Sequence, residues 1–262
     1  MRESLLVVGA GCLGRLVGEQ WRQRGPVLAE TKTEARHESM RQAGLVPRLR
    51  GSEPPPPTSY VVFSVPPSAV EDYPAEASRA VSLWQGGRGL VMVSSTGVYA
   101  VSESVREKSP TADTSRSKLL LDAERVVLEA GGVVVRMAGL YNALRGPHQV
   151  YLRRESSPRG PDGLINLIHY DDAATLVIAA LTRGVPGTVY LGCDNHPITR
   201  EDLLAATLAS PRFRGSGAIG CRFEGATGQP GKTCDGGWTR IQLGWEPLHS
   251  SFRAWALNDG GV

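Results

Sequence analysis

The sequence has few cysteines, no long apolar run and no cluster of basic residues, and each shortage argues against a class of protein. The four cysteines, at positions 12, 193, 221 and 234, show no C-x-x-C spacing, so we expect reduced thiols and no metal site. No apolar run approaches the ~20 residues of a membrane span. A net charge of +3 without a Lys/Arg run gives no reason to expect a nucleic acid partner.

The overall composition is that of an ordinary soluble protein. Hydrophobic residues make up 41% of the 262 residues and charged residues 21%, which allows a sizeable core. The first predicted strand begins at Leu5 and leaves no room for a targeting segment. We therefore expect a cytoplasmic protein, with an organelle stroma or matrix as the alternative if a presequence has been removed.

Short apolar runs alternate with amphipathic stretches along most of the chain. The predicted strands are 5–8, 27–31, 45–49, 60–65, 90–94, 133–137 and 188–192. The predicted helices are 13–24, 34–43, 75–84, 117–130 and 171–182, and a proline-rich loop at 51–59 stands where a crossover helix would be usual. This alternation predicts an α/β fold with a Rossmann-type doubly wound parallel sheet.

Two stretches interrupt the alternation and are richer in Gly, Pro and Arg. They cover residues 141–163 and 193–262, and we expect them to form a small C-terminal lobe that faces the substrate. The chain is thus predicted to be one unit over 1–262, with its Rossmann core at 1–140 and 164–192.

A glycine turn joins the first predicted strand to the first helix. It reads Gly9-Ala-Gly11-Cys12-Leu13-Gly14, the G-x-G-x-x-G pattern in the strand-turn-helix context that makes it informative. The first glycine permits the tight turn, the second lets a pyrophosphate approach the backbone, and the third lets helix and strand pack closely. The helix start offers unpaired N–H groups to phosphate. The turn therefore predicts a nicotinamide dinucleotide cofactor.

The end of the second strand, Glu30-Thr31-Lys32, is expected to read the adenosine ribose. Glu30 would accept hydrogen bonds from a 2′-hydroxyl and favour NAD, whereas Lys32 would neutralise a 2′-phosphate and favour NADP. The position of Lys32 favours NADP as the predicted cofactor, with NAD as the alternative.

Five further motifs follow the glycine turn: S-V-P-P-S at 64–68, V-S-S-T-G-V-Y at 93–99, R-M-A-G-L-Y at 136–141, N-L-I-H-Y-D-D at 166–172 and L-G-W-E-P at 243–247. In this order they resemble the extended short-chain dehydrogenase/reductase superfamily, in its NAD(P)-dependent epimerase/dehydratase-like branch, over nearly the whole chain. The resemblance implies cofactor contacts from Ser64, Val65, Pro66 and Ser94, and a catalytic serine at Ser95.

The resemblance breaks at the catalytic helix. The family's Tyr-x-x-x-Lys motif supplies a tyrosinate that exchanges a proton with substrate and a lysine that holds the nicotinamide ribose. This chain reads Thr114-Ser-Arg-Ser-Lys118, so the resemblance places Lys118 in both the catalytic and the cofactor-binding set but replaces the tyrosine by Thr114. A threonine hydroxyl does not ionise near neutral pH, so it cannot serve as the acid or base.

Three accounts of the missing tyrosine stay open. Another phenol could supply the proton, and the candidates are Tyr99, Tyr141, Tyr151 and Tyr170. His148, His169 or a water could replace it, or the site could bind nucleotide without turnover. His169 and Asp172 more often brace such a fold than touch substrate, and either Asp171 or Asp172 fits an N-cap for the helix that follows.

The functional hypothesis is an NAD(P)-dependent oxidoreductase or epimerase acting on a small hydroxyl- or carbonyl-bearing, sugar-like substrate. The alternative is a catalytically silent NAD(P)-binding sensor or a structural subunit of a larger assembly, for which Trp238, Trp245 and Trp255 would be interface anchors. The expected partner is a small molecule, with a homodimer or a complex as possible assemblies. Arginines near the lobe, Arg145, Arg153 and Arg154, could clamp an anionic substrate group or simply lie in solvent.

Overall fold

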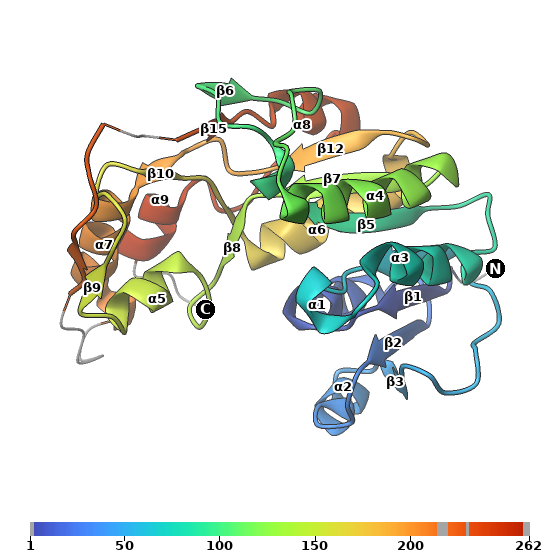
Figure 1. Ribbon diagram of the computed structural model, residues 1–262. Helices are drawn as coiled ribbons and strands as arrows, with labels where there is room; N and C mark the ends of the chain where they lie inside the picture. The colour runs from blue at the N-terminus through green and yellow to red at the C-terminus, as the bar shows by residue number, and fades with distance from the viewer. Residues whose placement is uncertain (1–2, 214–219, 229–230, 259–262) are drawn as a thin grey trace.

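The computed structural model describes residues 3–213, 220–228 and 231–258, and its centre is one open sheet of seven parallel strands (Figure 1). From edge to edge the strands are β3 (Val46–Leu49), β2 (Val27–Thr31), β1 (Leu5–Val8), β4 (Tyr60–Phe63), β5 (Leu90–Ser95), β7 (Val133–Met137) and β12 (Val189–Gly192). The predicted doubly wound α/β fold is confirmed. The strand order reverses between β1 and β4, where such sheets bind ligands.

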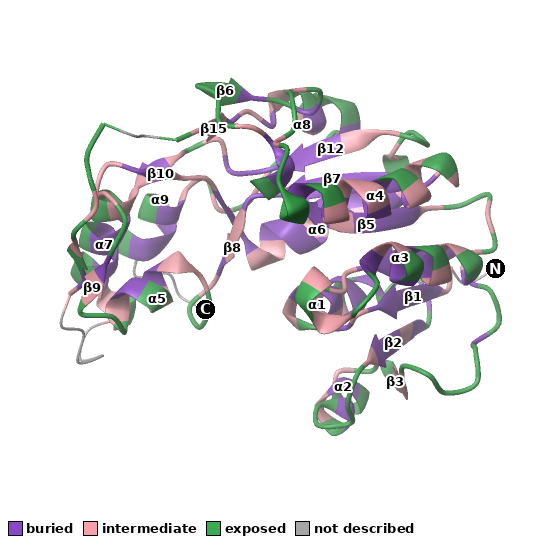
Figure 2. Ribbon diagram, in the orientation of Figure 1, coloured by how far each residue is buried: buried purple, intermediate pink, exposed green. Residues whose placement is uncertain are grey.

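Helices cover both faces of the sheet because its central strands are apolar throughout. All residues of β1 and β4 are buried (Figure 2). On one face α1 (Cys12–Trp21) packs against α6 (Tyr170–Arg183), and on the other α3 (Tyr73–Ser82) packs against α4 (Ser115–Glu129). The short α2 (His37–Gln42) contacts β3, and α8 (Gly237–Leu243) contacts β12. The proline-rich segment between β3 and β4 is a loop, as predicted.

The five predicted helix starts each differ from the observed ones by one to three residues, and capping explains two of these differences. Helix α6 begins at Tyr170, because the Nδ1 atom of His169 accepts a hydrogen bond from the Asp171 amide and serves as the cap. The prediction that Asp171 or Asp172 is the N-cap is therefore wrong. Helix α4 begins at Ser115, because the hydroxyl of Thr114 accepts the Ser117 amide at 3.1 Å.

The remaining segments build a smaller region beside the carboxyl ends of the sheet strands (Figure 1). Its elements are β8 (Gly139–Tyr141), α5 (Pro147–Leu152), β9 (Ser156–Ser157), β10 (Leu164–Ile165), β11 (Leu167–His169), β13 (Ile198–Thr199), α7 (Arg200–Ala209), β14 (Arg222–Phe223) and α9 (Phe252–Leu257). A separate pair, β6 (Ser104–Val105) and β15 (Thr233–Cys234), lies near α8. The smaller region has its own apolar core, in which Tyr141 packs edge-on against Phe252 and Trp255. Within the described ranges, no helix has the length and apolarity that a membrane span requires.

Candidate functional site

The turn between β1 and α1 is shaped by its glycines. Gly9 has a φ of +91°, and a Cβ there would lie 2.7 Å from the backbone nitrogen of Val65. A Cβ on Gly14 would lie 2.6 Å from the carbonyl oxygen of Gly9. Gly11, the N-cap of α1, differs because a Cβ there would meet nothing within 4 Å. Two glycines thus serve close packing, and the third keeps space open before the unpaired N–H groups of the helix.

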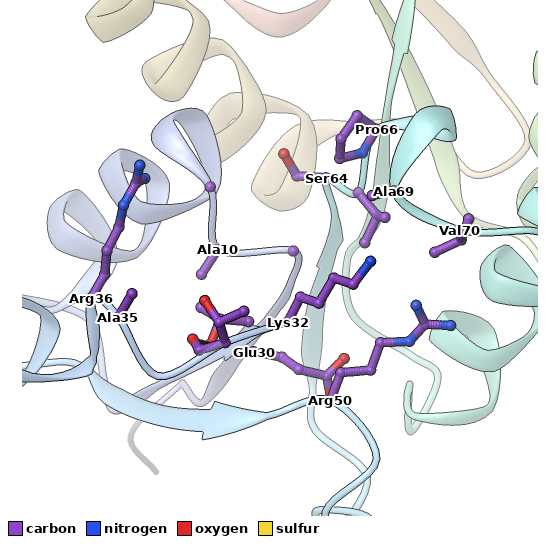
Figure 3. A pocket seen from close by; sticks show the side chains of 15 residues that line it. Ala10, Glu30, Lys32, Ala35, Arg36, Arg50, Ser64, Pro66, Ala69 and Val70 are labelled. Atoms are coloured by element: carbon purple, nitrogen blue, oxygen red, sulfur yellow. Dashed lines mark hydrogen bonds between the residues drawn. The ribbon is translucent and has the colours of Figure 1, made fainter.

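A cavity of about 360 Å³ opens beside this turn, at the carboxyl ends of β1, β2 and β4 (Figure 3). The expected cofactor residues that line it are Gly9, Gly11, Thr31, Lys32, Ser64, Val65 and Pro66. Three cationic side chains, Lys32, Arg36 and Arg50, line it as well. Figure 3 shows Lys32 and Arg50 extending toward the side of the cavity that carries Ala69 and Val70. The cavity is therefore positively charged.

Glu30 lies at the edge of this cavity but its carboxylate is already occupied. The side chain is 2% exposed, forms an ion pair with Arg79 and lies 3.4 Å from Nε of Arg48. Arg79 and Arg50 each contact Glu76 at 2.8 Å, so two carboxylates and three guanidiniums form a network beside the cavity. The expectation that Glu30 accepts hydrogen bonds from a ribose hydroxyl does not match this geometry. Lys32, by contrast, is exposed within the cavity.

A second cavity, of about 450 Å³, continues over the glycine turn toward β5. The residues that line both cavities are Gly11, Arg36, Ser64, Val65 and Pro66. Of the other expected site residues, Cys12, Leu13, Ser94 and Ser95 line the second cavity. Its lining contains three arginines (Arg36, Arg116 and Arg145) and, among the described residues, no carboxylate. The two cavities therefore adjoin at these five residues, and together they are called the groove, a positively charged site at the switch point of the sheet.

The helix that carries Thr114 and Lys118 presents different residues to this groove than the family pattern implies. Arg116 and Leu120, one helical turn apart, line the second cavity. Lys118 lies on another face of α4, with its side chain 65% exposed and Nζ 2.6 Å from Asp113. Ser95 does line the cavity, and its Oγ accepts a hydrogen bond from the Gly97 amide at 3.0 Å. Sequence reasoning missed Arg116, although a cation in the first turn of that helix was a usable signal.

The four tyrosines considered as replacements for the missing phenol lie in different surroundings. Tyr99 is buried, donates to the carbonyl of Glu107 at 3.1 Å, and burial raises its pKa to about 12. Tyr141 and Tyr151 are buried in the smaller region. Tyr170, the first residue of α6, is partly buried and lines the second cavity together with Ser95. Only this one of the four candidates reaches the groove.

The two candidate histidines have pKa values well below neutral pH. His148 is fully buried, and this burial lowers its pKa to about 4. Burial, and after it the neighbouring His249, lowers the pKa of His169 to about 3. Both imidazoles are therefore neutral at pH 7 and pack among the aromatic side chains of the smaller region.

His169 also belongs to a group with Asp172 and His249 whose possible ligand atoms all lie within 4.8 Å of one another. The Asp172 carboxylate accepts the Leu248 amide at 2.7 Å and the His249 amide at 3.1 Å, and it lies 3.0 Å from His249 Nδ1. The imidazole rings of His169 and His249 are close, with centroids 3.8 Å apart and planes tilted by 30°. These contacts tie the segment before α9 to the start of α6, and they already occupy both oxygens of the carboxylate.

Comparisons with known proteins identify the fold. No protein-family model matches the chain, and no curated protein matches it. Among solved structures, a functionally unknown conserved protein from Silicibacter pomeroyi superposes with a TM-score of 0.77 at 21% identity, over 96% of this chain and 95% of that one. dTDP-glucose 4,6-dehydratase from Bacillus anthracis, solved with NAD, gives 0.74 at 14% identity over 97% and 95%.

A further structural neighbour, UDP-N-acetylglucosamine 4-epimerase from Bacillus cereus, gives a TM-score of 0.72 at 13% identity over 97% and 98% of the two chains. The structural neighbours thus include sugar-nucleotide epimerases and dehydratases, some solved with NAD. At these identities the likeness establishes the fold that this chain shares with them, and the site must be argued from its own residues.

The four cysteines differ in how accessible they are to reagents in solution. This difference allows a test of the groove that needs no substrate. Cys12 is half-buried and lines the second cavity, while Cys193, Cys221 and Cys234 are buried. Burial raises the pKa of Cys193 to about 12 and that of Cys234 to about 11. We expect iodoacetamide to modify Cys12 first, and a dinucleotide that occupies the groove to slow that reaction about tenfold or more.

Peptide mapping by mass spectrometry measures this alkylation, and the Cys12→Ser variant is the control that should lose the early label. Labelling of a buried cysteine ahead of Cys12, or a rate that a saturating dinucleotide leaves unchanged, would contradict the placement of Cys12 in the groove.

Proposed function

We propose that this chain binds NADP along the groove, with the adenosine half in the first cavity and the nicotinamide half in the second. The observation that carries the proposal is that the two cavities adjoin at Gly11, which lines both and has open space before its Cα. A Cβ at Gly11 would fill that space, and the start of α1 offers its N–H groups there. Arg36 lines both cavities, where it would neutralise the pyrophosphate.

The preference for NADP over NAD rests on the charges around the first cavity. Glu30 also lines this cavity, but its carboxylate is buried in its ion pairs with Arg79 and Arg48. Lys32 and Arg50 line the cavity, and Arg50 is only partly neutralised by Glu76 at 2.8 Å. A 2′-phosphate would therefore meet net positive charge, whereas a 2′-hydroxyl would leave it uncompensated.

The proposed reaction is of the oxidoreductase or epimerase type, on a small substrate that carries a hydroxyl or carbonyl group. When bound, the dinucleotide supplies the hydride acceptor or donor. Because Ser95 Oγ accepts from the Gly97 amide, its own proton is free to donate to a substrate oxygen. Arg116 and Arg145 make the second cavity positive, which favours a substrate with negative charge.

Calorimetry with NADPH and NADH tests the proposal. We expect NADPH to bind more tightly, and Lys32→Gln to weaken NADPH by about tenfold to a hundredfold, the equivalent of losing one charge-assisted hydrogen bond of about 1.5–3 kcal/mol. NADH binding should stay nearly unchanged in the same variant. Lys108→Gln is the matched control, because Lys108 is an exposed lysine beside a different cavity near β12.

Absence of binding by either dinucleotide would end the proposal. Tighter binding of NADH than NADPH would leave the dinucleotide site in place but remove the role of Lys32.

A further inference from the structure

The starts of two helices meet at the second cavity and bring together groups that the sequence keeps far apart. Cys12 opens α1 and Tyr170 opens α6, and these two helices pack against each other on one face of the sheet. Both side chains line the second cavity together with Ser95. The phenol of Tyr170 therefore lies in the same cavity as the serine that the family pattern places beside a substrate oxygen.

The cavity contains one other tyrosine, and its hydroxyl is already committed. Tyr73 is 1% exposed, and its O–H donates to the carbonyl of Val65 at 3.1 Å. Burial also raises the pKa of the Tyr73 phenol well above that of an ordinary phenol. The hydroxyl of Tyr73 is thus already paired, and Tyr170 is the other tyrosine of the lining, whose hydroxyl is open to a ligand.

A cation stands beside the Tyr170 phenol. Arg145 lines the same cavity, and its loop is fixed by Asn142, whose side-chain oxygen accepts the Leu144 and Arg145 amides at 3.0 and 2.9 Å. The pKa of the Tyr170 phenol is raised, first by burial and then by the Cys12 thiol, and the Arg145 guanidinium offsets part of this rise. A guanidinium at this place can do for Tyr170 what the lysine of a Tyr-x-x-x-Lys helix does for its tyrosine.

From this arrangement we infer that Tyr170 is the acid and base of the proposed reaction, with Arg145 as its positioning cation. The inference rests on the proposed function. In the oxidation direction, the substrate O–H proton passes to the Tyr170 phenolate while the C–O bond becomes a carbonyl, and the carbon-bound hydrogen leaves with its electron pair as the hydride that the dinucleotide accepts. In reduction the phenol returns the proton to the alkoxide oxygen, so protons and electrons balance in both directions.

The first test follows the ionisation of Tyr170 and needs no substrate. Tyrosinate absorbance is titrated against pH in the wild type and in Tyr170→Phe, and their difference isolates this one phenol. The titration is run without nucleotide, with 2′,5′-ADP, and with NADP⁺, whose nicotinamide ring is positively charged. We expect NADP⁺ to shift the ionisation of Tyr170 down by about one pH unit or more, and 2′,5′-ADP to leave it unchanged.

Equal titrations with NADP⁺ and 2′,5′-ADP, under conditions where calorimetry shows both bound, would overturn the assignment. Tyr151→Phe is the matched control, because Tyr151 packs against Phe223 in the smaller region and lines neither cavity. Its substitution should leave the nucleotide-dependent shift intact.

The second test follows turnover with NADPH and 4-carboxybenzaldehyde, a carbonyl probe that carries the negative charge favoured by the second cavity. We expect Tyr170→Phe to lower kcat about a hundredfold or more while the Kd for NADPH stays within about twofold of the wild type. An unchanged kcat in Tyr170→Phe would overturn the role of Tyr170. A wild type that binds no NADPH, or that binds it and does not reduce the probe, would instead count against the proposed function.

Discussion

A Gly11→Ala variant should keep the melting temperature of the wild type and lose most of its affinity for the dinucleotide. The backbone of Gly11, at φ −71° and ψ −154°, is one that alanine adopts without strain. A Cβ there meets nothing within 4 Å in the protein alone, so the fold has no reason to resist it. The methyl group would, however, occupy space between the two cavities that the pyrophosphate needs. We expect affinity to fall on the order of a hundredfold, about 3 kcal/mol.

The other two glycines of the turn provide the contrast. At Gly9 a Cβ would lie 2.7 Å from the Val65 nitrogen at a φ of +91°, and at Gly14 it would lie 2.6 Å from the Gly9 carbonyl oxygen. Gly9→Ala and Gly14→Ala should therefore each cost about 1–3 kcal/mol in the free energy of unfolding without any ligand. Thermal unfolding and calorimetry with NADPH separate the two effects.

If Gly11→Ala bound NADPH as tightly as the wild type, the pyrophosphate would not cross the turn at this point. A large loss of stability in Gly11→Ala would mean that the open space is filled by something other than a ligand.

The parts of this molecule that the sequence predicts well depend on local patterns. Apolar runs located the strands of the sheet to within two residues at each end, because strands covered on both faces are apolar throughout. The glycine turn was identifiable for a similar reason, since the spacing of its three glycines between a strand and a helix is a short local pattern.

The ion pairs of the charged site residues were harder to predict, because the partners can come from distant positions in the sequence. From the sequence, Glu30 was expected to be free to bind a ribose hydroxyl. In the structure its carboxylate is occupied by Arg79 of α3 and Arg48 of β3. The direction of Lys118 depended on where its helix begins, which the Thr114 cap decides. Nothing in the local sequence of Glu30 identifies its two partners, whereas the cap that sets the helix of Lys118 lies only four residues before it.

For the smaller region, composition predicted only a lobe over 141–163 and 193–262, and none of its helices and strands was predicted. Six of its nine elements are strands of two or three residues, too short to show a period. Its core joins Tyr141 to residues more than a hundred positions later, among them Phe252 and Trp255. Such contacts exist only after the chain has folded.

The largest effect on stability should come from breaking the buried ion pair between Arg136 on β7 and Glu124 on α4. Arg136 is 6% exposed and Glu124 1% exposed, and Nη2 of the arginine lies 2.7 Å from the carboxylate. Glu124 also accepts the Ser94 hydroxyl at 2.5 Å, so the pair joins α4 to the end of β5 beside the second cavity. Arg136→Met would leave a buried carboxylate without its cation, and we expect a cost of about 3–5 kcal/mol.

In a chain of this size such a loss corresponds to a melting temperature lower by on the order of 10 °C. The control lies on the same helix: Arg125 pairs with Asp122 at 2.7 Å, but both side chains are at least half exposed. Arg125→Met should therefore cost less than about 1 kcal/mol.

Removing both buried charges, in Arg136→Met with Glu124→Met, should recover much of the loss, because it is the unpaired charge rather than the missing contact that destabilises the core. Equal melting temperatures for Arg136→Met and Arg125→Met would show that the buried carboxylate finds another partner. In that case Glu124 would not be what holds Ser94, and with it the end of β5, at the wall of the groove.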